Sequence, residues 1–190
     1  MENHKKHPIA SLQIRCQDTI ADTTSLMQQQ PSINILLDQL YTISELLTQV
    51  EMMLTKVKHT HHQQLQNLFT QYRNTLLQLK RDLKDGILQQ RNSTDVRQKD
   101  MIESYFDSLG KWTELLYGLH MSQDMNQINR LIGKSLALLH QIDYLIKHCN
   151  DPILRKKLEE LRNIILMLQY ELEAKLKREK QLDDDDKTLE

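Results

Sequence analysis

The chain has 190 residues and a formal net charge of -1, with only 4 Gly, 3 Pro and 5% aromatic residues. It contains 33 Leu and 20 Gln. Because Gly and Pro interrupt regular structure while Leu and Gln favour helices, this composition predicts long helices. It excludes Gly-rich phosphate loops and cysteine-based zinc knuckles, and the nearly neutral charge argues against an obligate nucleic-acid-binding protein.

The two cysteines, Cys16 and Cys149, are far apart and form no C-x-x-C motif, which favours buried thiols in a reducing compartment. No apolar segment typical of a secretory signal follows the polar N-terminus. The longest apolar run, residues 164–168, is far shorter than the roughly 20 residues that cross a bilayer. We therefore expect a cytoplasmic protein without a transmembrane segment.

The first third of the chain predicts one weak and one strong helix. Residues 1–7 are polar, and we expect them to be disordered. Pro8 suits the first turn of a helix over residues 9–29, whose Thr and Ser residues lower helix propensity, so this helix is expected to attach loosely. Beyond residue 32, apolar residues alternate spacings of four and three in a coiled-coil-like seam. The seam consists of Leu36, Leu40, Ile43, Leu47, Val50, Leu54 and Val57.

Residues 58–64 are entirely polar, and the apolar pattern resumes beyond them in a different phase. Such a gap is either a turn or a stutter within one long helix. Thr60 and Gln63 have the spacing of a capping box, which favours a turn, although no Gly, Pro or Asn lies there. We favour a break near His59 and Thr60.

Three further junctions follow. Residues 91–95 are rich in cap-forming side chains, Ser122 is a second candidate cap, and Asp151 precedes Pro152 in a typical helix start. The sequence therefore predicts an all-α fold, an antiparallel up-and-down bundle of five or six helices. It is either compact or elongated with coiled-coil-like packing. We expect one bundle domain over residues 8–181.

An acidic tail over residues 182–190 is expected to be disordered. Its DDDDK segment resembles the recognition sequence of enteropeptidase, which is used to remove tags. A native tail and a tag remnant are equally compatible with this sequence, and we assign the tail no function.

The histidines are the only candidates for metal or acid–base chemistry. His59, His61 and His62 form one group, but the chain has no Glu-x-x-His motif of the kind that carboxylate-bridged helical metal sites use. The pairs His120–Asp124 and His140–Asp143 have no nucleophile at an interpretable spacing. The sequence therefore predicts no catalytic, cofactor-binding or metal-binding residues, no cofactor and no enzymatic activity.

Four of the aromatic residues lie within 13 positions and are the candidate partner-binding residues. Tyr105 and Trp112 share one helical stripe with leucines, which favours core packing. Phe106, Thr113 and Tyr117 form a neighbouring stripe that would anchor a protein partner if it is exposed.

A second candidate surface is basic. Its residues outnumber the nearby acidic ones and could follow a phosphate backbone or an anionic membrane. They are Arg73, Lys80, Arg81, Lys84 and Arg91.

Together these features predict a non-catalytic helical module for protein–protein interaction, such as an adaptor, chaperone, regulator or scaffold subunit, that recognises partners through helix faces. The partner is a protein, and whether a further copy of the chain completes the bundle stays open. The alternative is a protein that binds nucleic acid or an anionic membrane surface. A histidine-dependent metalloprotein ranks last.

Overall fold

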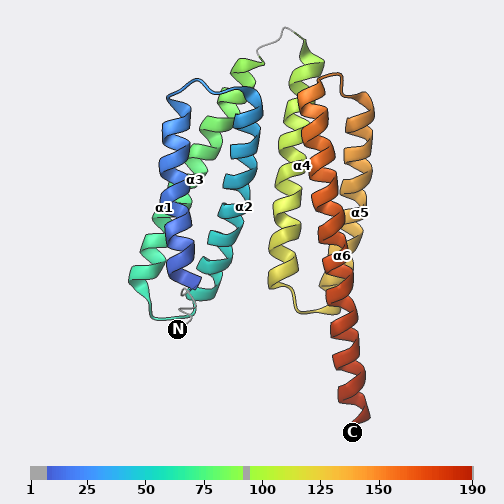
Figure 1. Cartoon of the computed structure of the whole chain (residues 1–190). Coiled ribbons are helices and arrows are strands. Elements are labelled where there is room, and N and C mark those ends of the chain that lie inside the picture. The colour runs from blue at the N-terminus through green and yellow to red at the C-terminus, as the bar shows by residue number, and fades with distance from the viewer. Residues whose placement is uncertain (1–7, 92–94, 190) are drawn as a thin grey trace, which may run out of the picture. The chain divides into compact units, whose positions relative to one another are not determined.

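The computed structural model describes residues 8–91 and 95–189, and these residues form six α-helices and no strand. Within residues 8–90, and separately within residues 96–188, consecutive helices run antiparallel, which confirms the predicted all-α, up-and-down arrangement (Figure 1). The helices are α1 (Pro8–Met27), α2 (Ile33–Val57), α3 (Gln63–Gln90), α4 (Val96–Met121), α5 (Met125–His148) and α6 (Pro152–Thr188).

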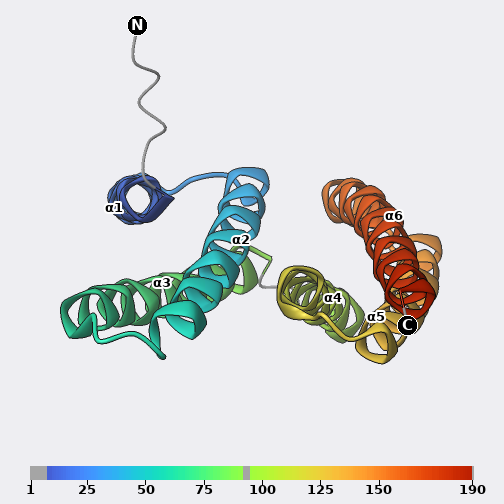
Figure 2. The same ribbon diagram turned by 90° about the horizontal axis from the view of Figure 1, so that it is seen from below.

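The chain divides into two compact units, one containing α1 to α3 and the other α4 to α6. In the first unit α2 and α3 pack most extensively, and α1 lies against both of them (Figure 2). In the second unit α5 packs against both α4 and α6, most extensively against α6. Each unit is thus a three-helix bundle with short connections. The expectation of one bundle domain over residues 8–181 stays a prediction.

The apolar cores of the two units contain the leucines and isoleucines that the sequence pattern predicted to be buried. Leu40, Ile43 and Val50 of α2 are fully buried, as are Leu76, Leu83 and Ile87 of α3. The corresponding residues of the second unit include Ile142 and Ile165. Burying such a side chain contributes roughly 1.5–3 kcal/mol, so these seams are the main stabilising term of each unit.

The polar gap between the first two long helices is a turn, as expected, because α2 ends at Val57 and α3 begins at Gln63. The predicted capping box of Thr60 and Gln63 is wrong, since His62 occupies the N-cap position of α3 without a side-chain hydrogen bond. Instead, Thr60 Oγ1 and Gln66 Nε2 each donate to the carbonyl oxygen of Val57, at 2.8 Å. These bonds satisfy the last carbonyl of α2.

Aspartates begin all three helices of the second unit. Asp95, Asp124 and Asp151 each accept a hydrogen bond from the backbone N–H two residues ahead, at 2.9–3.0 Å. The junctions near residues 91–95 and 151 are confirmed, and Pro152 occupies the first turn of α6. The cap of α5 is Asp124 rather than the predicted Ser122, which ends α4.

The final helix is longer than expected. It continues to Thr188, through most of the segment that we expected to be disordered, and extends past α4 and α5 (Figure 1). An ion pair between Lys187 Nζ and Asp183 Oδ2, at 2.8 Å, links successive turns there. The expectation of disorder in residues 1–7 lies outside the described residues.

One glycine has a packing role. A Cβ atom at Gly118 in α4 would lie 2.7 Å from Cδ2 of Leu131 in α5, a distance that real contacts avoid. The Leu131 side chain of α5 therefore packs directly on α4 at Gly118. Gly110, on the same helix, has open space at the corresponding position.

We expect Gly118→Ala to be less stable than Gly110→Ala by roughly 1–3 kcal/mol. Both substitutions remove the helix-weakening effect of glycine, so they differ mainly in the clash with Leu131. Urea denaturation of the two full-length variants measures the difference. Equal unfolding free energies would show that the Leu131 side chain can move away from the added methyl group at position 118 without cost.

We expect Asp151→Ala to lower the unfolding free energy by about 1 kcal/mol, because it removes the acceptor for the first backbone N–H groups of α6. Asp100→Ala, at an exposed position inside α4, is the control and should change stability little. Thermal denaturation followed by circular dichroism compares them. A control as destabilised as Asp151→Ala would count against the capping role.

Candidate functional site

An open groove lies between α4 and α5, with a volume of about 300 Å³. Its floor is apolar, and charged or amide side chains surround it. We call this surface the α4–α5 groove. It is lined by Lys111, Glu114 and Leu115 of α4 and by Leu131, Lys134, Ala137, Leu138 and Gln141 of α5.

A hydrogen-bond network joins the two helices beside the groove. Lys111 Nζ donates to Gln141 Oε1 at 2.9 Å and forms an ion pair with Asp107 Oδ2 at 3.1 Å. Gln141 Nε2 donates to the same Asp107 oxygen at 3.4 Å. The hydrogen bond from Lys111 lowers the pKa of Asp107, so the carboxylate stays ionised at neutral pH. The network positions Lys111 and Gln141 at the edge of the groove.

The rest of the groove combines an apolar floor with exposed charges. Leu115 and Leu138 are both 3% exposed, whereas Ala137 is exposed at the surface. Glu114 and Lys134 are exposed on the two helices that face each other across the groove. None of the lining residues is Ser, Thr, Cys or His. This combination can accept apolar side chains of a partner and place its polar groups against the charges.

The aromatic candidates lie mostly inside the second unit. Tyr105 and Trp112 are 2% exposed, which matches the core role expected for their stripe. Phe106 is 9% exposed and lies edge-on to Tyr105, with ring centroids 6.4 Å apart. Only Tyr117 of the four is partly exposed. The structure therefore does not bring them together at the surface, and a partner-binding role for Tyr105, Phe106, Trp112 and Tyr117 stays a prediction.

The basic candidates do not form one open surface. Arg73 pairs with Glu51 of α2. Burial lowers the pKa of Lys80 and of Lys84, and the charge of Lys84 lowers that of Lys80 further. Arg81 is exposed, and Arg91 is partly buried. A role in binding nucleic acid or an anionic surface stays a prediction, and the ion pair and the burial both reduce the charge available for it.

The histidines within residues 8–91 and 95–189 have no metal-like arrangement. In the described part of the chain, no group of three His, Cys, Asp or Glu side chains is placed to hold a metal ion. His59, His61 and His62 are exposed in the turn between α2 and α3. The aspartates of the two predicted pairs have other partners, because Asp124 caps α5 and Asp143 pairs with Arg162 at 2.5 Å.

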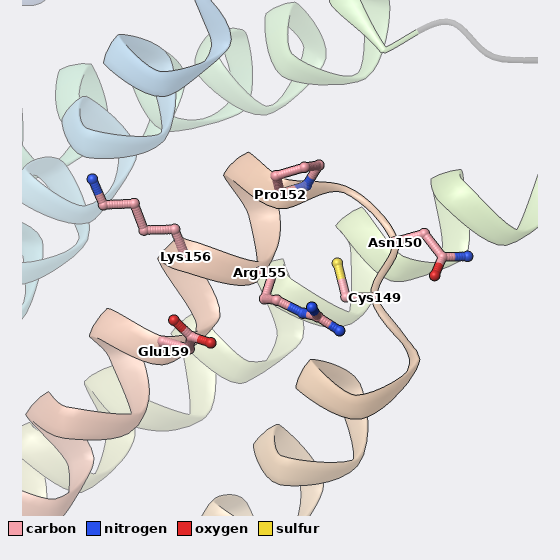
Figure 3. A pocket seen from close by; sticks show the side chains of 6 residues that line it. All are labelled: Cys149, Asn150, Pro152, Arg155, Lys156 and Glu159. Atoms are coloured by element: carbon pink, nitrogen blue, oxygen red, sulfur yellow. The ribbon is translucent and has the colours of Figure 1, made fainter.

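A second cavity, of about 260 Å³, lies at the junction of α5 and α6. Arg155 extends toward Cys149 in this cavity, whereas Lys156 extends away from it (Figure 3). Arg155 Nε donates to the Ile146 carbonyl oxygen at 3.3 Å, and the Cys149 thiol donates to the Asp151 carbonyl oxygen at 3.5 Å. Burial raises the pKa of the Cys149 thiol, which disfavours the nucleophilic thiolate. These contacts hold the junction together.

Sequence analysis missed the α4–α5 groove. Its floor leucines belong to the apolar stripes of two separate helices, and periodicity does not show which edge of a stripe stays open. Gly118 and Gly133 were the available signals, since small residues within helices often mark close approach or open surface.

No helix within residues 8–91 and 95–189 has the length and apolar character needed to span a membrane. Searches of protein-family models, of curated proteins and of solved structures found no match for this chain.

Proposed function

We propose that the chain is a non-catalytic helical module that binds a protein partner through a helix face. The observation that carries this proposal is the α4–α5 groove, with its apolar floor of Leu115, Leu131 and Leu138 and its charged rim. Apolar pockets with a polar rim are where interface side chains contribute most of their binding energy.

The dimensions of the groove favour a helix as the partner element. Its lining residues on α5 extend from Leu131 to Gln141, which corresponds to about 15 Å along a helix axis. A partner helix lying in the groove would insert apolar residues at helical spacing over two to three turns. The exposed Ala137 leaves room for its backbone to approach.

We expect a photo-crosslinking amino acid at position 137 to capture the partner in cells that contain the full-length chain. The same amino acid at Ala174 should capture nothing above background. Ala174 is the matched control because it is also an exposed alanine on a helix, but on α6 and outside the groove. Mass spectrometry of the crosslinked species identifies the partner.

Substitutions at positions 137 and 174 also test how much the groove contributes to the affinity for the partner. With the captured partner, Ala137→Arg should weaken binding at least about tenfold, because a charged side chain would enter the apolar groove. Ala174→Arg should leave the affinity unchanged. Equal effects of the two substitutions would contradict the proposal, as would a purified chain whose main ligand is nucleic acid, bound with steep salt dependence.

A further inference from the structure

Helix α1 is bound to the first unit by few buried side chains. Of its 20 residues only Leu12, Cys16 and Thr23 are buried, whereas α2 buries eleven of 25. Helix α3 also buries only four of its 28 residues, but it packs against α2 far more extensively than α1 packs against either helix. Burial of apolar area is the dominant stabilising term between helices, so α1 is held less firmly than α2 and α3 hold each other. Helix α1 lies against both α2 and α3.

Polar contacts supply much of the remaining attachment. Thr23 Oγ1 accepts a hydrogen bond from Gln39 Nε2 of α2 at 2.7 Å, and Gln17 Nε2 donates to Tyr72 Oη of α3 at 3.1 Å. Arg15 of α1 also donates to a glutamine of α2. Such bonds stabilise only modestly, because water replaces them when the helix detaches.

The end of α1 shows where it enters the groove. Both Cε of Met27 and Cδ1 of Leu36 come within 4 Å of a Cβ atom built at Gly86 in α3. Met27 therefore packs where α2 and α3 meet. We call the surface formed by Leu36, Gln39 and Gln49 of α2 and by Tyr72 and Gly86 of α3 the α1 site.

Local structure further weakens the attachment. The hydroxyl groups of Thr23 and Thr24 donate to the carbonyl oxygens of Thr19 and Ile20 one turn earlier, at 2.7 Å, a pattern that slightly destabilises and bends helices. Gln30, in the short connection to α2, has φ of 50°, a left-handed conformation that costs free energy outside glycine.

We infer that the α1 site is a docking groove for an amphipathic helix of a protein partner, and that α1 occupies it within the chain until the partner displaces it. This inference rests on the proposed function, that the module binds helices. The ligand chemistry follows from the occupant that the structure already holds there. The partner helix needs an aliphatic residue, a small residue, a hydroxyl and a second aliphatic residue at the spacings of Leu12, Cys16, Thr23 and Met27.

The polar groups of the α1 site further restrict which helices can bind there. Its polar contacts come from Gln39, Gln49 and Tyr72, which are uncharged. A helix with hydroxyl and amide groups along its contact face matches these partners. A carboxylate at the position of Thr23, where the contact is partly buried, would lose hydration with only the Gln39 amide as its partner, so the site selects against it there.

Cys16 provides a direct measurement of detachment. It is fully buried, and burial raises the pKa of its thiol to about 11, so it reacts only when α1 opens. In the full-length Cys149→Ser variant it is the only thiol. We expect a maleimide to label it, and α1 amides to exchange with deuterium, at least about 100-fold faster than α2 amides exchange. Exchange of α1 and α2 at one common rate would overturn the inference.

Docking is tested with a fluorescent synthetic peptide of residues 8–27 as the probe. We expect full-length Leu12→Ala to bind it at least about tenfold more tightly than the wild type, because truncating a buried leucine loosens the resident helix. Ile14→Ala is the matched control, since Ile14 is 48% exposed on the same helix, and it should bind as the wild type does. Excess peptide that carries Cys16→Ser, and therefore has no thiol of its own, should also accelerate labelling of Cys16 in the Cys149→Ser protein, because it traps the open state.

The outcomes separate the possibilities. Failure of the peptide to bind Leu12→Ala, or equal binding to Ile14→Ala, would overturn docking at the α1 site. A mass of two chains for Leu12→Ala in light scattering would also overturn it, because the groove would then take α1 of a second copy. Failure of crosslinking at position 137 would contradict the proposed function and leave the Cys16 and peptide results unaffected.

Discussion

The burial of leucine and isoleucine stripes between neighbouring helices is the interaction on which both units depend. Both cysteines are free, and polar links between helices such as Arg15–Gln49, Lys111–Gln141 and Arg162–Asp143 lie at the surface. Apolar burial is non-directional, so it drives any two apolar helix faces together. The shapes of the faces and a few polar groups then decide which two faces pair. A fold stabilised in this way can exchange one amphipathic helix for another at moderate cost. The α4–α5 groove and the α1 site are two surfaces where that property matters.

Much of this architecture could be predicted from the sequence. Spacings of three and four in Leu36, Leu40, Ile43 and Val50 identify a buried helix face, and that face is buried. Asp151 followed by Pro152 specifies a helix start through local hydrogen bonding, which needs no knowledge of the rest of the chain. A sustained apolar spacing and an Asp–Pro helix start were therefore interpreted correctly, whereas the single cap candidates Thr60 and Ser122 were not.

Features that depend on the neighbouring helix could not be predicted in this way. The width of the aromatic stripe left open whether Phe106 is exposed, and the structure answers this because α4 is buried over a broad face and Phe106 is only 9% exposed. The α4–α5 groove depends on how Leu131 of α5 packs against Gly118 of α4, which is a property of the pair of helices. The turn between α2 and α3 was located correctly. However, one of the hydrogen bonds to the Val57 carbonyl oxygen comes from Gln66, which lies beyond the predicted capping-box residues Thr60 and Gln63.

The position of the single tryptophan has a spectroscopic consequence. Trp112 is buried in α4, so intrinsic tryptophan fluorescence reports only on the unit containing α4 to α6. The ellipticity at helical wavelengths sums over all six helices. Melting curves recorded by the two probes will coincide if the chain unfolds as one cooperative system and will separate if its halves unfold independently. Fluorescence and circular dichroism of the wild-type chain thus show whether it unfolds as one cooperative unit or as more than one, without any label or substitution.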